Sequence, residues 1–592
     1  MRRLLWLISF VGLAADVHPD LYLAHVRYLA SPELKGRATG SPELEKAAHY
    51  IAAEFRSFGL KPADGKNFEL AFPVALGAHL GSKNHLKFKE PGENRALVSG
   101  KDFLPLSFSS SGELHSTVVF AGFGITDKKD NYDDYDGLDV TGKFVLILRH
   151  EPKESPHKEH VSFADKAINA KMHGARGVIL VNDADHHESP HESPHDTASD
   201  DIGKFSESAG PRNAGVLFIR IRYDVAEGWM KAEGRDLHDL SKQIDQDGHP
   251  HSFALSNLYV DLSVDVRVET KTVHNVAAYL PGSTDEYVVV GAHYDHLGLG
   301  DEHSLAPSQI GTVHPGADDN ASGTAGVIEL ARWASQQPKQ KRGILFLTFA
   351  GEELGLLGSE WYVNHPALPL ENAVAMINMD MIGRIREGKI YLSGTGTGST
   401  FPQLVEEVKP PAPLQIDMAE KAGYGSSDHT SFTTKGVPVL FFFSGLHADY
   451  HKPSDTADKI DSADAAKLLD YIADLITRLE NDPRPQFIRV AEPVAPTGSG
   501  GGSGYGPNFG SIPDFNEPPK GVRFADVRDG TPAAKAGLKA GDILIEFEGK
   551  DISNLYDFTY ALRAHKPGDL VLVKVLRAGK EIEAKVLLTE RR

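Results

Sequence analysis

The sequence predicts an α/β protein with a mixed, largely parallel sheet flanked by helices, extended by a β-rich insertion and a small C-terminal domain. Apolar runs alternate with helical patterns from about residue 270 to 480, as in a parallel sheet with crossover helices. Between residues 114 and 265 the apolar runs become short and β-type. Pro, Gly and Ser then dominate the end of residues 483–504, which indicates a flexible linker. A length of 592 residues suffices for roughly three to five domains.

At the N-terminus, two arginines precede an apolar run and a pair of alanines within residues 1–15, MRRLLWLISFVGLAA. This order is typical of a secretory signal peptide, so we expect an exported protein, periplasmic or extracellular; a buried N-terminal helix is the alternative. The run is shorter than the about 20 residues that span a membrane, and no other segment is apolar enough. Helices are expected between residues 19 and 60, with a helix start at Ser41-Pro42-Glu43.

In the inserted region, STVVFAGFGI and GKFVLILRH are β-type runs, and ADKAINAKMHGARGVILVND predicts a helix followed by a strand. Residues 183–201 form a polar, His-rich segment with an ESPH repeat. Clustered histidines can bind metal, but the Pro and Ser content favours a solvated loop.

The central region reads as strands and helices in alternation, closed by an amphipathic helix. The expected segments are EYVVVGAHYDHLG, ASGTAGVIELARWASQQP, KRGILFLTFAGEELGLLGSEWYVNHP, ENAVAMINMDMIG, VPVLFFFSG and SADAAKLLDYIADLITRLEND.

Charge and cysteine content exclude several classes of function. The net charge of −20 argues against nucleic acid as the main partner, because binding phosphates favours a basic face. The chain has no cysteine, which excludes disulfides, thiolate metal sites and a cysteine nucleophile. Any metal must therefore be held by His, Asp and Glu, a donor set more typical of catalytic than of structural zinc.

Five groups of His, Asp and Glu residues follow the predicted strands or open a helix or loop. Ligands in open α/β sheets bind outside the carboxyl ends of the strands, so these side chains can converge although they are far apart in sequence. The groups are His293 with Asp295, Asp318 with Asp319, Glu352 with Glu353, Asp380, and His451.

Their composition suits two metal ions that share a bridging carboxylate, each with one His and one further carboxylate. The pair Glu352 and Glu353 supplies one ligand and one base, and Asp295 can hold the second nitrogen of His293. Taken singly, each motif has a plainer explanation: Asp-Asp can cap a helix, a Glu pair can favour a helix dipole, and His451 can be a loop histidine. The occurrence of all five groups in this order favours the metal centre.

The segments AHYDH, PGADDNASG, FAGEELGLLGS, NMDMIG, GSSDHTSF and HKPSDT together resemble the di-zinc exopeptidases of the aminopeptidase Y and bacterial leucyl aminopeptidase family, peptidase family M28. The resemblance covers about residues 265–480 and the N-terminal helices. It implies a zinc-exopeptidase core (phosphorylase/hydrolase-like), two Zn²⁺ ions, and an aminopeptidase that releases N-terminal amino acids from peptides. A carboxypeptidase or dipeptidase of the same superfamily, or a non-catalytic receptor-like binding protein, is the alternative.

Residue by residue, the resemblance implies that His293 and Asp380 hold one zinc ion and that Glu353 and His451 hold the other. Asp318 would bridge the two ions, and the peptide bond between Asp318 and the next aspartate would be cis.

The same resemblance implies the groups that act on the substrate. Glu352 would be the general base that activates the zinc-bound water and later protonates the leaving amine. Asp295 would orient His293, and Tyr450 would stabilise the tetrahedral oxyanion, with plain packing as its alternative role. The turn Ser427-Asp428-His429 is expected near the pocket.

Two further regions resemble accessory domains. Residues 114–265 resemble a protease-associated (PA) domain, which would shape or cover the substrate cleft, and residues 505–592 resemble a PDZ domain with YGPNFGSIPDF as its carboxylate-binding loop and first strand. A PDZ domain would bind an extended C-terminal peptide, although a packing module is the alternative. The expected boundaries are residues 1–15 for the signal peptide, 16–113 for the N-terminal helices and part of the peptidase domain, 114–265 for the PA domain, 266–482 for the catalytic domain, 483–504 for the linker and 505–592 for the PDZ domain.

Overall fold

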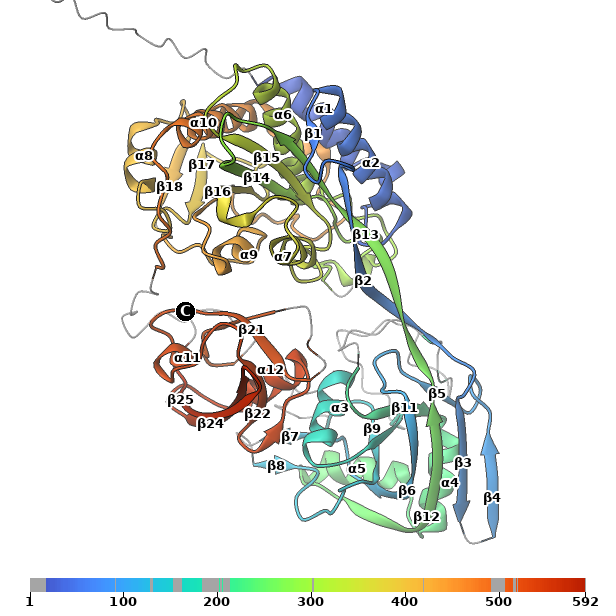
Figure 1. Cartoon of the computed structure of the whole chain (residues 1–592). Coiled ribbons are helices and arrows are strands. Elements are labelled where there is room, and N and C mark those ends of the chain that lie inside the picture. The colour runs from blue at the N-terminus through green and yellow to red at the C-terminus, as the bar shows by residue number, and fades with distance from the viewer. Residues whose placement is uncertain are drawn as a thin grey trace, which may run out of the picture. The chain divides into compact units, whose positions relative to one another are not determined.

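The computed structural model of the chain divides into two compact units, which are described one at a time (Figure 1). The first unit comprises Met1–Val74 and Thr272–Glu492, and the second comprises Ala75–Lys271 and Pro493–Arg592. The structure describes residues 17–90, 92–127, 131–152, 162–183, 202, 205, 213–300, 303–418, 420–490, 506–514, 518 and 520–590. The predicted signal peptide, most of the His-rich segment and the end of the predicted linker lie outside the described residues.

The first unit begins with two helices, as predicted. These are α1 (Pro19–Leu29) and α2 (Pro42–Ser57), separated by the short helix η1 (Pro32–Leu34). The Ser41 hydroxyl accepts the backbone N–H of Leu44 at 3.1 Å, the N-cap contact that the Ser-Pro-Glu pattern predicts. The apolar positions of α2 that recur at helical spacing are buried against the unit.

In the described part of the chain, nine strands form the sheet of the first unit, in the order β1-β13-β15-β14-β16-β19-β17-β18 with β2 beside β13. Strands β14, β15, β16 and β19 are mutually parallel, whereas β13 and β17 run antiparallel to their neighbours β15 and β19. The expectation of a mixed, largely parallel sheet is therefore confirmed. The strands are β1 (Lys61–Pro62), β2 (Glu69–Leu80), β13 (Val266–Leu280), β14 (Tyr287–His293), β15 (Gly343–Phe349), β16 (Ala373–Met379), β17 (Lys389–Ser393), β18 (Gln415–Asp417) and β19 (Val439–Phe443).

Helices cover both faces of this sheet (Figure 1). Helices α6 and α10 pack against β14 and against α1, and α9 packs against α7, β16 and β19. Strands β14, β15 and β16 are buried along their whole length because both faces are covered. The remaining elements are η2 (Pro307–Gln309), η3 (Ala317–Ser322), α6 (Gly323–Ser335), α7 (Leu357–Asn364), η4 (Leu370–Asn372), α8 (Phe401–Glu407), α9 (His429–Thr434), η5 (Ala457–Lys459) and α10 (Ser462–Asn481).

A second mixed sheet forms the first part of the second unit, with eight strands among the described residues in the order β4-β3-β12-β6-β9-β10-β11-β5. Helix α3 and strand β10 confirm the helix-then-strand pattern predicted there. The elements are β3 (His85–Glu90), β4 (Glu93–Leu97), β5 (Phe103–Pro105), β6 (Gly112–Phe120), β7 (Thr126–Asp127), β8 (Tyr132–Asp133), β9 (Phe144–Leu148), α3 (Phe163–Met172), β10 (Gly177–Val181), β11 (Leu217–Ile221), α4 (Tyr223–Ala232), α5 (Leu237–Asp247) and β12 (Phe253–Val264).

The start of this second unit differs from the expected boundary at residue 114. Strands β3, β4 and β5 belong to its sheet, so the unit begins at Ala75. The reason is long-range pairing: β3 pairs with β12, with Leu86 opposite Leu262, and a local pattern cannot show a partner so far along the chain.

The C-terminal domain has the strands and the groove helix that its sequence predicts. Its edge strand β20 pairs with β21, and α12 begins at the capping residue Asn554. A cluster of phenylalanines that includes Phe509, Phe524 and Phe558 fills its core. The elements are β20 (Ser511–Pro513), β21 (Val522–Val527), α11 (Pro532–Lys535), β22 (Ile543–Phe547), β23 (Lys550–Asp551), α12 (Leu555–Arg563), β24 (Leu570–Arg577) and β25 (Lys580–Leu587).

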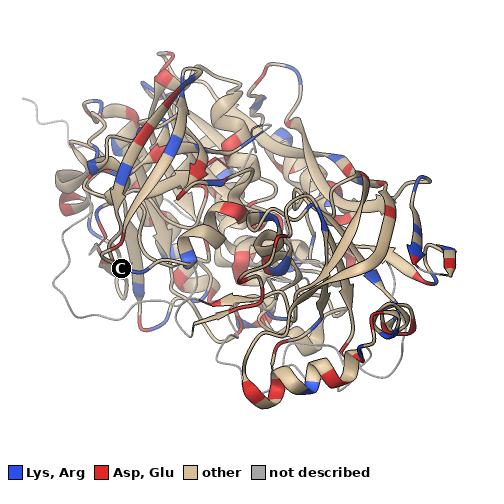
Figure 2. Ribbon diagram, turned by 90° about the horizontal axis from the view of Figure 1, so that it is seen from below, with Lys and Arg blue, Asp and Glu red and all other residues tan. Residues whose placement is uncertain are grey.

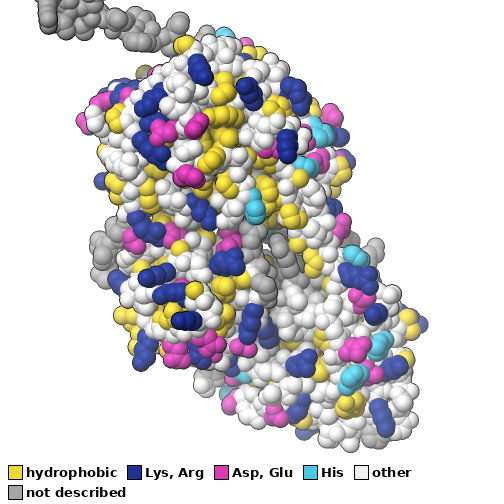
Figure 3. All heavy atoms as spheres, viewed as in Figure 1, with side chains coloured by type: hydrophobic (Ala, Val, Ile, Leu, Met, Phe, Trp, Pro, Cys, Tyr) yellow, Lys and Arg dark blue, Asp and Glu magenta, His cyan; other side chains and the backbone are white. Residues whose placement is uncertain are grey.

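Charged side chains are distributed over many elements. Lys and Arg are interspersed with Asp and Glu along helices and strands in Figure 2. On the face of the first unit seen in Figure 3, hydrophobic side chains lie between charged ones. Every helix in the described residues is too short or too polar to cross a membrane.

Candidate metal centre

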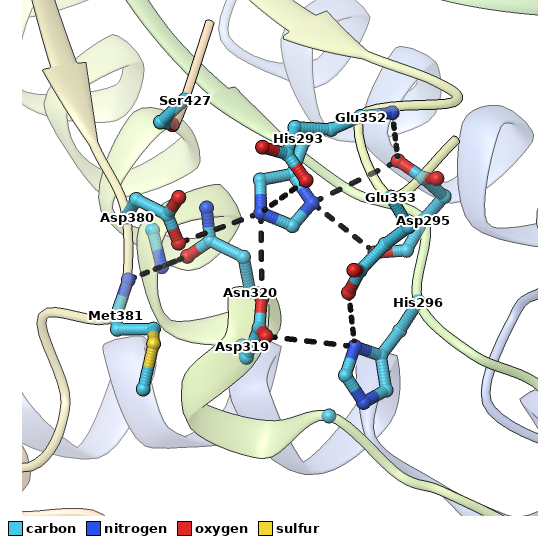
Figure 4. Close-up of polar contacts among 12 residues, drawn as sticks. His293, Asp295, His296, Asp319, Asn320, Glu352, Glu353, Asp380, Met381 and Ser427 are labelled. Carbon is cyan, nitrogen blue, oxygen red and sulfur yellow. Dashed lines mark hydrogen bonds and ion pairs between the residues drawn. The ribbon is translucent and has the colours of Figure 1, made fainter. Parts of the chain in front are cut away.

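The candidate site lies where the parallel strands of the first unit end (Figure 4). His293 is the last residue of β14 and pairs in register with Phe349, the last residue of β15. Asp380 directly follows β16, and Glu352 and Glu353 lie in the loop after β15. Because these strands are parallel, their carboxyl ends meet at one edge of the sheet and bring the side chains together.

One group of candidate ligands joins His293, Asp319 and Asp380. The Nε2 atom of His293 lies 3.4 Å from Asp319 Oδ1 and 3.4 Å from Asp380 Oδ1. The ligand atoms of the three residues all lie within 4.8 Å of one another. The structure thus brings together His293 and Asp380, the pair expected at one ion.

A second group forms around Glu353. The Nε2 atom of His451 lies 3.1 Å from Glu353 Oε2 and 3.2 Å from Asp319 Oδ2. On the other side, His296 Nδ1 lies 2.7 Å from Glu353 Oε1. His296, the second histidine of AHYDH, was not among the predicted site residues, because only His293 and Asp295 of that segment were assigned roles.

Asp319 is common to both groups, and its two carboxylate oxygens face different histidines (Figure 4). The carboxylate of Asp318 points elsewhere: Oδ1 accepts the Gly383 N–H at 2.7 Å, and Oδ2 lies 3.2 Å from His447 Nε2. The prediction that Asp318 bridges the site is therefore wrong. The cis peptide bond also lies one position later than expected, between Asp319 and Asn320. Sequence could not separate the two aspartates because the loop backbone decides which one faces the strand ends.

Buried polar groups hold the loop that carries Asp319. The Asp455 carboxylate accepts the N–H groups of Asp318 at 2.9 Å and Asp319 at 3.1 Å. Gly316 has φ +57°, and a Cβ atom there would lie 2.1 Å from the Asp319 carbonyl oxygen, so only glycine fits. Arg37 donates to the Gly316 carbonyl oxygen at 2.8 Å, and burial lowers the pKa of Arg37 to about 10.

Asn320 also supports this loop from the far side. Its Oδ1 atom accepts the N–H groups of Gly323 at 2.8 Å and Met381 at 3.2 Å, and its Nδ2 atom donates to the Met379 carbonyl oxygen at 3.0 Å. None of the loop supports Arg37, Asn320 and Asp455 was singled out from sequence, because each acts through contacts to distant backbone atoms.

Glu352 and Asp295 flank His293. Glu352 Oε2 lies 3.8 Å from His293 Nε2, and the Glu352 N–H donates to Asp295 Oδ1 at 3.2 Å. Asp295 Oδ1 in turn lies 3.7 Å from His293 Nδ1, the nitrogen that faces away from Asp319. Burial raises the pKa of Glu352 well above its usual range, and the negative charges of Glu353 and Asp380 raise it further.

Tyr450 and the Ser427 turn lie around the ligands. The ring of Tyr450 stacks on that of His451, with centroids 3.9 Å apart, and burial raises the Tyr450 pKa well above its usual range. The Ser427 hydroxyl accepts from Asn378 Nδ2 at 2.9 Å. His429 stacks on Phe441 at 4.2 Å, and burial lowers its pKa to about 3, so this imidazole is neutral.

The donor set fits divalent metal ions. Asp295 and Asp319 are buried, and the side chains of Glu353 and Asp380 are only 6% and 13% exposed. Several carboxylates thus share one small volume, an arrangement that is costly unless cations compensate it. The buried Nε2 atom of His451 lies beside two carboxylate oxygens yet forms no hydrogen bond in the described part of the site. A metal ion shared by these atoms would satisfy all of them, with the N and O ligands of catalytic zinc.

The fold and the site define an α/β metallopeptidase. The sequence of residues 275–476 matches peptidase family M28, residues 112–216 match the PA domain and residues 505–588 match the PDZ domain. Aminopeptidase YwaD of Bacillus subtilis (strain 168) is 32% identical over 478 residues, which are 76% of this chain and 83% of that protein. The chain therefore belongs to peptidase family M28, with a PA domain and a PDZ domain.

Other relatives match in part. The match with a probable leucine aminopeptidase of Arthroderma otae is 30% identical over 207 residues, 33% of this chain, and spans 54% of that relative, about half its length. Among solved structures, a zinc aminopeptidase from Bacillus subtilis is 20% identical with a TM-score of 0.46, over 79% of this chain and 96% of that one. The aminopeptidase from Aneurinibacillus sp. strain AM-1 is 22% identical with a TM-score of 0.44, over 81% and 97%.

Proposed function

We propose that this metallopeptidase is a zinc aminopeptidase that releases N-terminal amino acids from peptides. The observation that carries the proposal is the carboxylate of Asp319, which lies between two His-and-carboxylate groups with the acid Glu352 beside one of them. The names of the relatives, aminopeptidase YwaD and several leucine aminopeptidases, support the choice of aminopeptidase.

Two zinc ions would be held around Asp319. His293 and Asp380 would hold one ion, and Glu353 and His451 would hold the other. His296, hydrogen-bonded to Glu353, would orient that carboxylate. When bound, the ions would polarise the scissile carbonyl group and lower the pKa of the attacking water.

Glu352 would move the proton. Its carboxylate lies beside His293 Nε2 and accepts the proton of the attacking water as the hydroxide adds to the carbonyl carbon. The same carboxyl group then protonates the leaving amine as the C–N bond breaks. The raised pKa of Glu352 suits both steps, because a base with a higher pKa holds the proton more firmly between them. Asp295 would keep His293 oriented through Nδ1.

The substrate's free amine suits the acidic character of the site. The carboxylates of Asp380, Glu352 and Glu353 can accept hydrogen bonds from the free α-amine of a bound substrate.

Hydrolysis of leucine p-nitroanilide tests the proposal, with the N-acetylated compound as the matched control and each assay run with and without a chelator. We expect chelator-sensitive cleavage of the free-amine compound alone. Cleavage of C-terminal or dipeptide substrates instead would support a carboxypeptidase or dipeptidase. Absence of hydrolysis of every substrate by a zinc-loaded, folded chain would refute catalysis and favour a receptor-like binding protein.

Two finer assignments rest on sequence and fold. The PDZ domain would bind an extended peptide C-terminus along β20, an edge strand that pairs on one side with β21. A fluorescent peptide with a free C-terminus should then bind more tightly than its C-terminal amide. Residues 1–15 would direct export, so the chain expressed with this segment should be recovered outside the cytoplasm, and deletion of the segment should keep it inside.

A further inference from the structure

A second cluster of metal-type ligands lies in the first unit, apart from the Asp319 site. It consists of Glu45 and His49 on α2, Glu69 at the start of β2, and His274 on β13. The ligand atoms of Glu45, Glu69 and His274 all lie within 4.8 Å of one another. Glu45 and His49 are four residues apart and share one helix face, a spacing that lets two side chains reach one ion.

The contacts within this cluster link carboxylates to imidazoles. His274 Nδ1 lies 2.9 Å from Glu45 Oε2, and His49 Nδ1 lies 2.8 Å from Glu69 Oε1. Among the described residues, Glu45 and Glu69 form ion pairs only with these histidines and with no Lys or Arg. Two carboxylates are thus held close together without a permanent positive charge to balance them.

One carboxylate oxygen of the cluster is available to a cation. Glu45 Oε1 is buried and has no hydrogen-bond partner among the described residues, although the side chain as a whole is 30% exposed. A buried carboxylate oxygen without a partner is costly, and a cation placed between Glu45, Glu69 and His274 would remove that cost. Partial exposure of the three side chains leaves a route by which an ion can enter from solvent.

We propose that Glu45, Glu69 and His274 bind one divalent transition-metal ion of the zinc class, with His49 hydrogen-bonded to Glu69 beside it. The imidazole and carboxylate donors match zinc, whereas calcium and magnesium prefer all-oxygen sites. The ion joins α2 and β2 to β13. A hydrogen bond links this site to the segment that carries the catalytic ligands. The hydroxyl of the buried Tyr294, which lies between His293 and Asp295, donates to the His274 carbonyl oxygen.

Zinc content per chain tests this site in the full-length protein. Wild type and the double variant Glu45→Gln/Glu69→Gln are equilibrated with Zn²⁺, freed of loose ions by gel filtration and measured by elemental mass spectrometry. The matched control is Asp247→Asn, which removes a carboxylate 2.7 Å from His251 in a simple His–Asp pair. We expect the double variant to hold one zinc ion fewer per chain than wild type, and the control to match wild type.

A further variant separates this proposal from the proposed peptidase site. Asp319→Asn should lose zinc from the catalytic centre while it keeps the ion at Glu45. Equal zinc content in wild type and the folded double variant would overturn the second site without affecting the first. If the double variant does not fold, crystals of wild type with zinc decide: anomalous scattering at Glu45, Glu69 and His274 supports the proposal, and density confined to the Asp319 centre overturns it.

Discussion

Replacement of the two neighbouring aspartates, one at a time, measures which one bridges the metal centre. Asp319 oxygens lie 3.4 Å from His293 Nε2 and 3.2 Å from His451 Nε2, so any cation held by these atoms lies closer than about 4 Å to the carboxylate. At that distance and an effective dielectric constant of about 20, the interaction energy of two unit charges is about 4 kcal/mol. Asp319→Asn should therefore lower kcat/KM roughly a thousandfold, since about 1.4 kcal/mol corresponds to a factor of ten.

Asp318→Asn is the matched control, because it makes the same chemical change one residue earlier. An asparagine oxygen can still accept the Gly383 N–H, so the expected loss is confined to the 3.2 Å contact with His447. That loss of interaction free energy amounts to about 1–3 kcal/mol, or roughly 5–150-fold in kcat/KM at most.

The assay is kcat/KM for leucine p-nitroanilide at saturating zinc, with zinc content and thermal unfolding measured on the same samples. The Asp319 bridge is refuted if Asp318→Asn, folded like wild type, lowers kcat/KM as much as Asp319→Asn or loses more zinc. That result would return the bridging role to Asp318.

Three other substitutions follow from the structure. Glu352→Gln should lower kcat about 10²–10⁴-fold with zinc content unchanged, and a loss of zinc instead would make Glu352 a ligand. The activity of wild type should fall as pH drops through the raised pKa of Glu352, because the protonated carboxyl group cannot accept a proton from water. Gly316→Ala places a Cβ 2.1 Å from the Asp319 carbonyl oxygen and should abolish zinc-dependent activity, so a fully active variant contradicts the loop geometry. Burial raises the pKa of Glu480 from 4.5 to about 8, so the stability this group contributes is complete below pH 4.5 and is lost as pH rises to about 8. Glu480→Gln should flatten that decline, by a few kcal/mol at most, in urea unfolding curves across this pH range; an unchanged pH profile would show that Glu480 ionises freely in the fold.

Local sequence patterns predicted much of the architecture. Continuous apolar runs predicted the buried strands β14, β15 and β16, and an N-cap with helical periodicity predicted α2. The compact unit that contains the PA region begins at Ala75, before the expected residue 114, because β3 pairs with β12, more than 150 residues along the chain, and that pairing leaves no local mark.

The sequence by itself determined the kinds of ligand and their order along the chain: His293, the Glu352–Glu353 pair, Asp380 and His451 all follow predicted strands, and parallel strands must present their ends together. Only the tertiary structure decided that Asp319 rather than Asp318 faces both histidine groups.

Only the tertiary structure showed that His296 contacts Glu353 and that Glu45 and Glu69 lie beside His274. Glu45, Glu69 and His274 lie on α2, β2 and β13, and only the packing of these separate elements brings them together. For Asp319 the reason lies in its loop. Strand periodicity sets which residues reach the end of a sheet, whereas the direction of a side chain in a loop depends on distant groups such as Arg37 and Asp455, which hold its backbone.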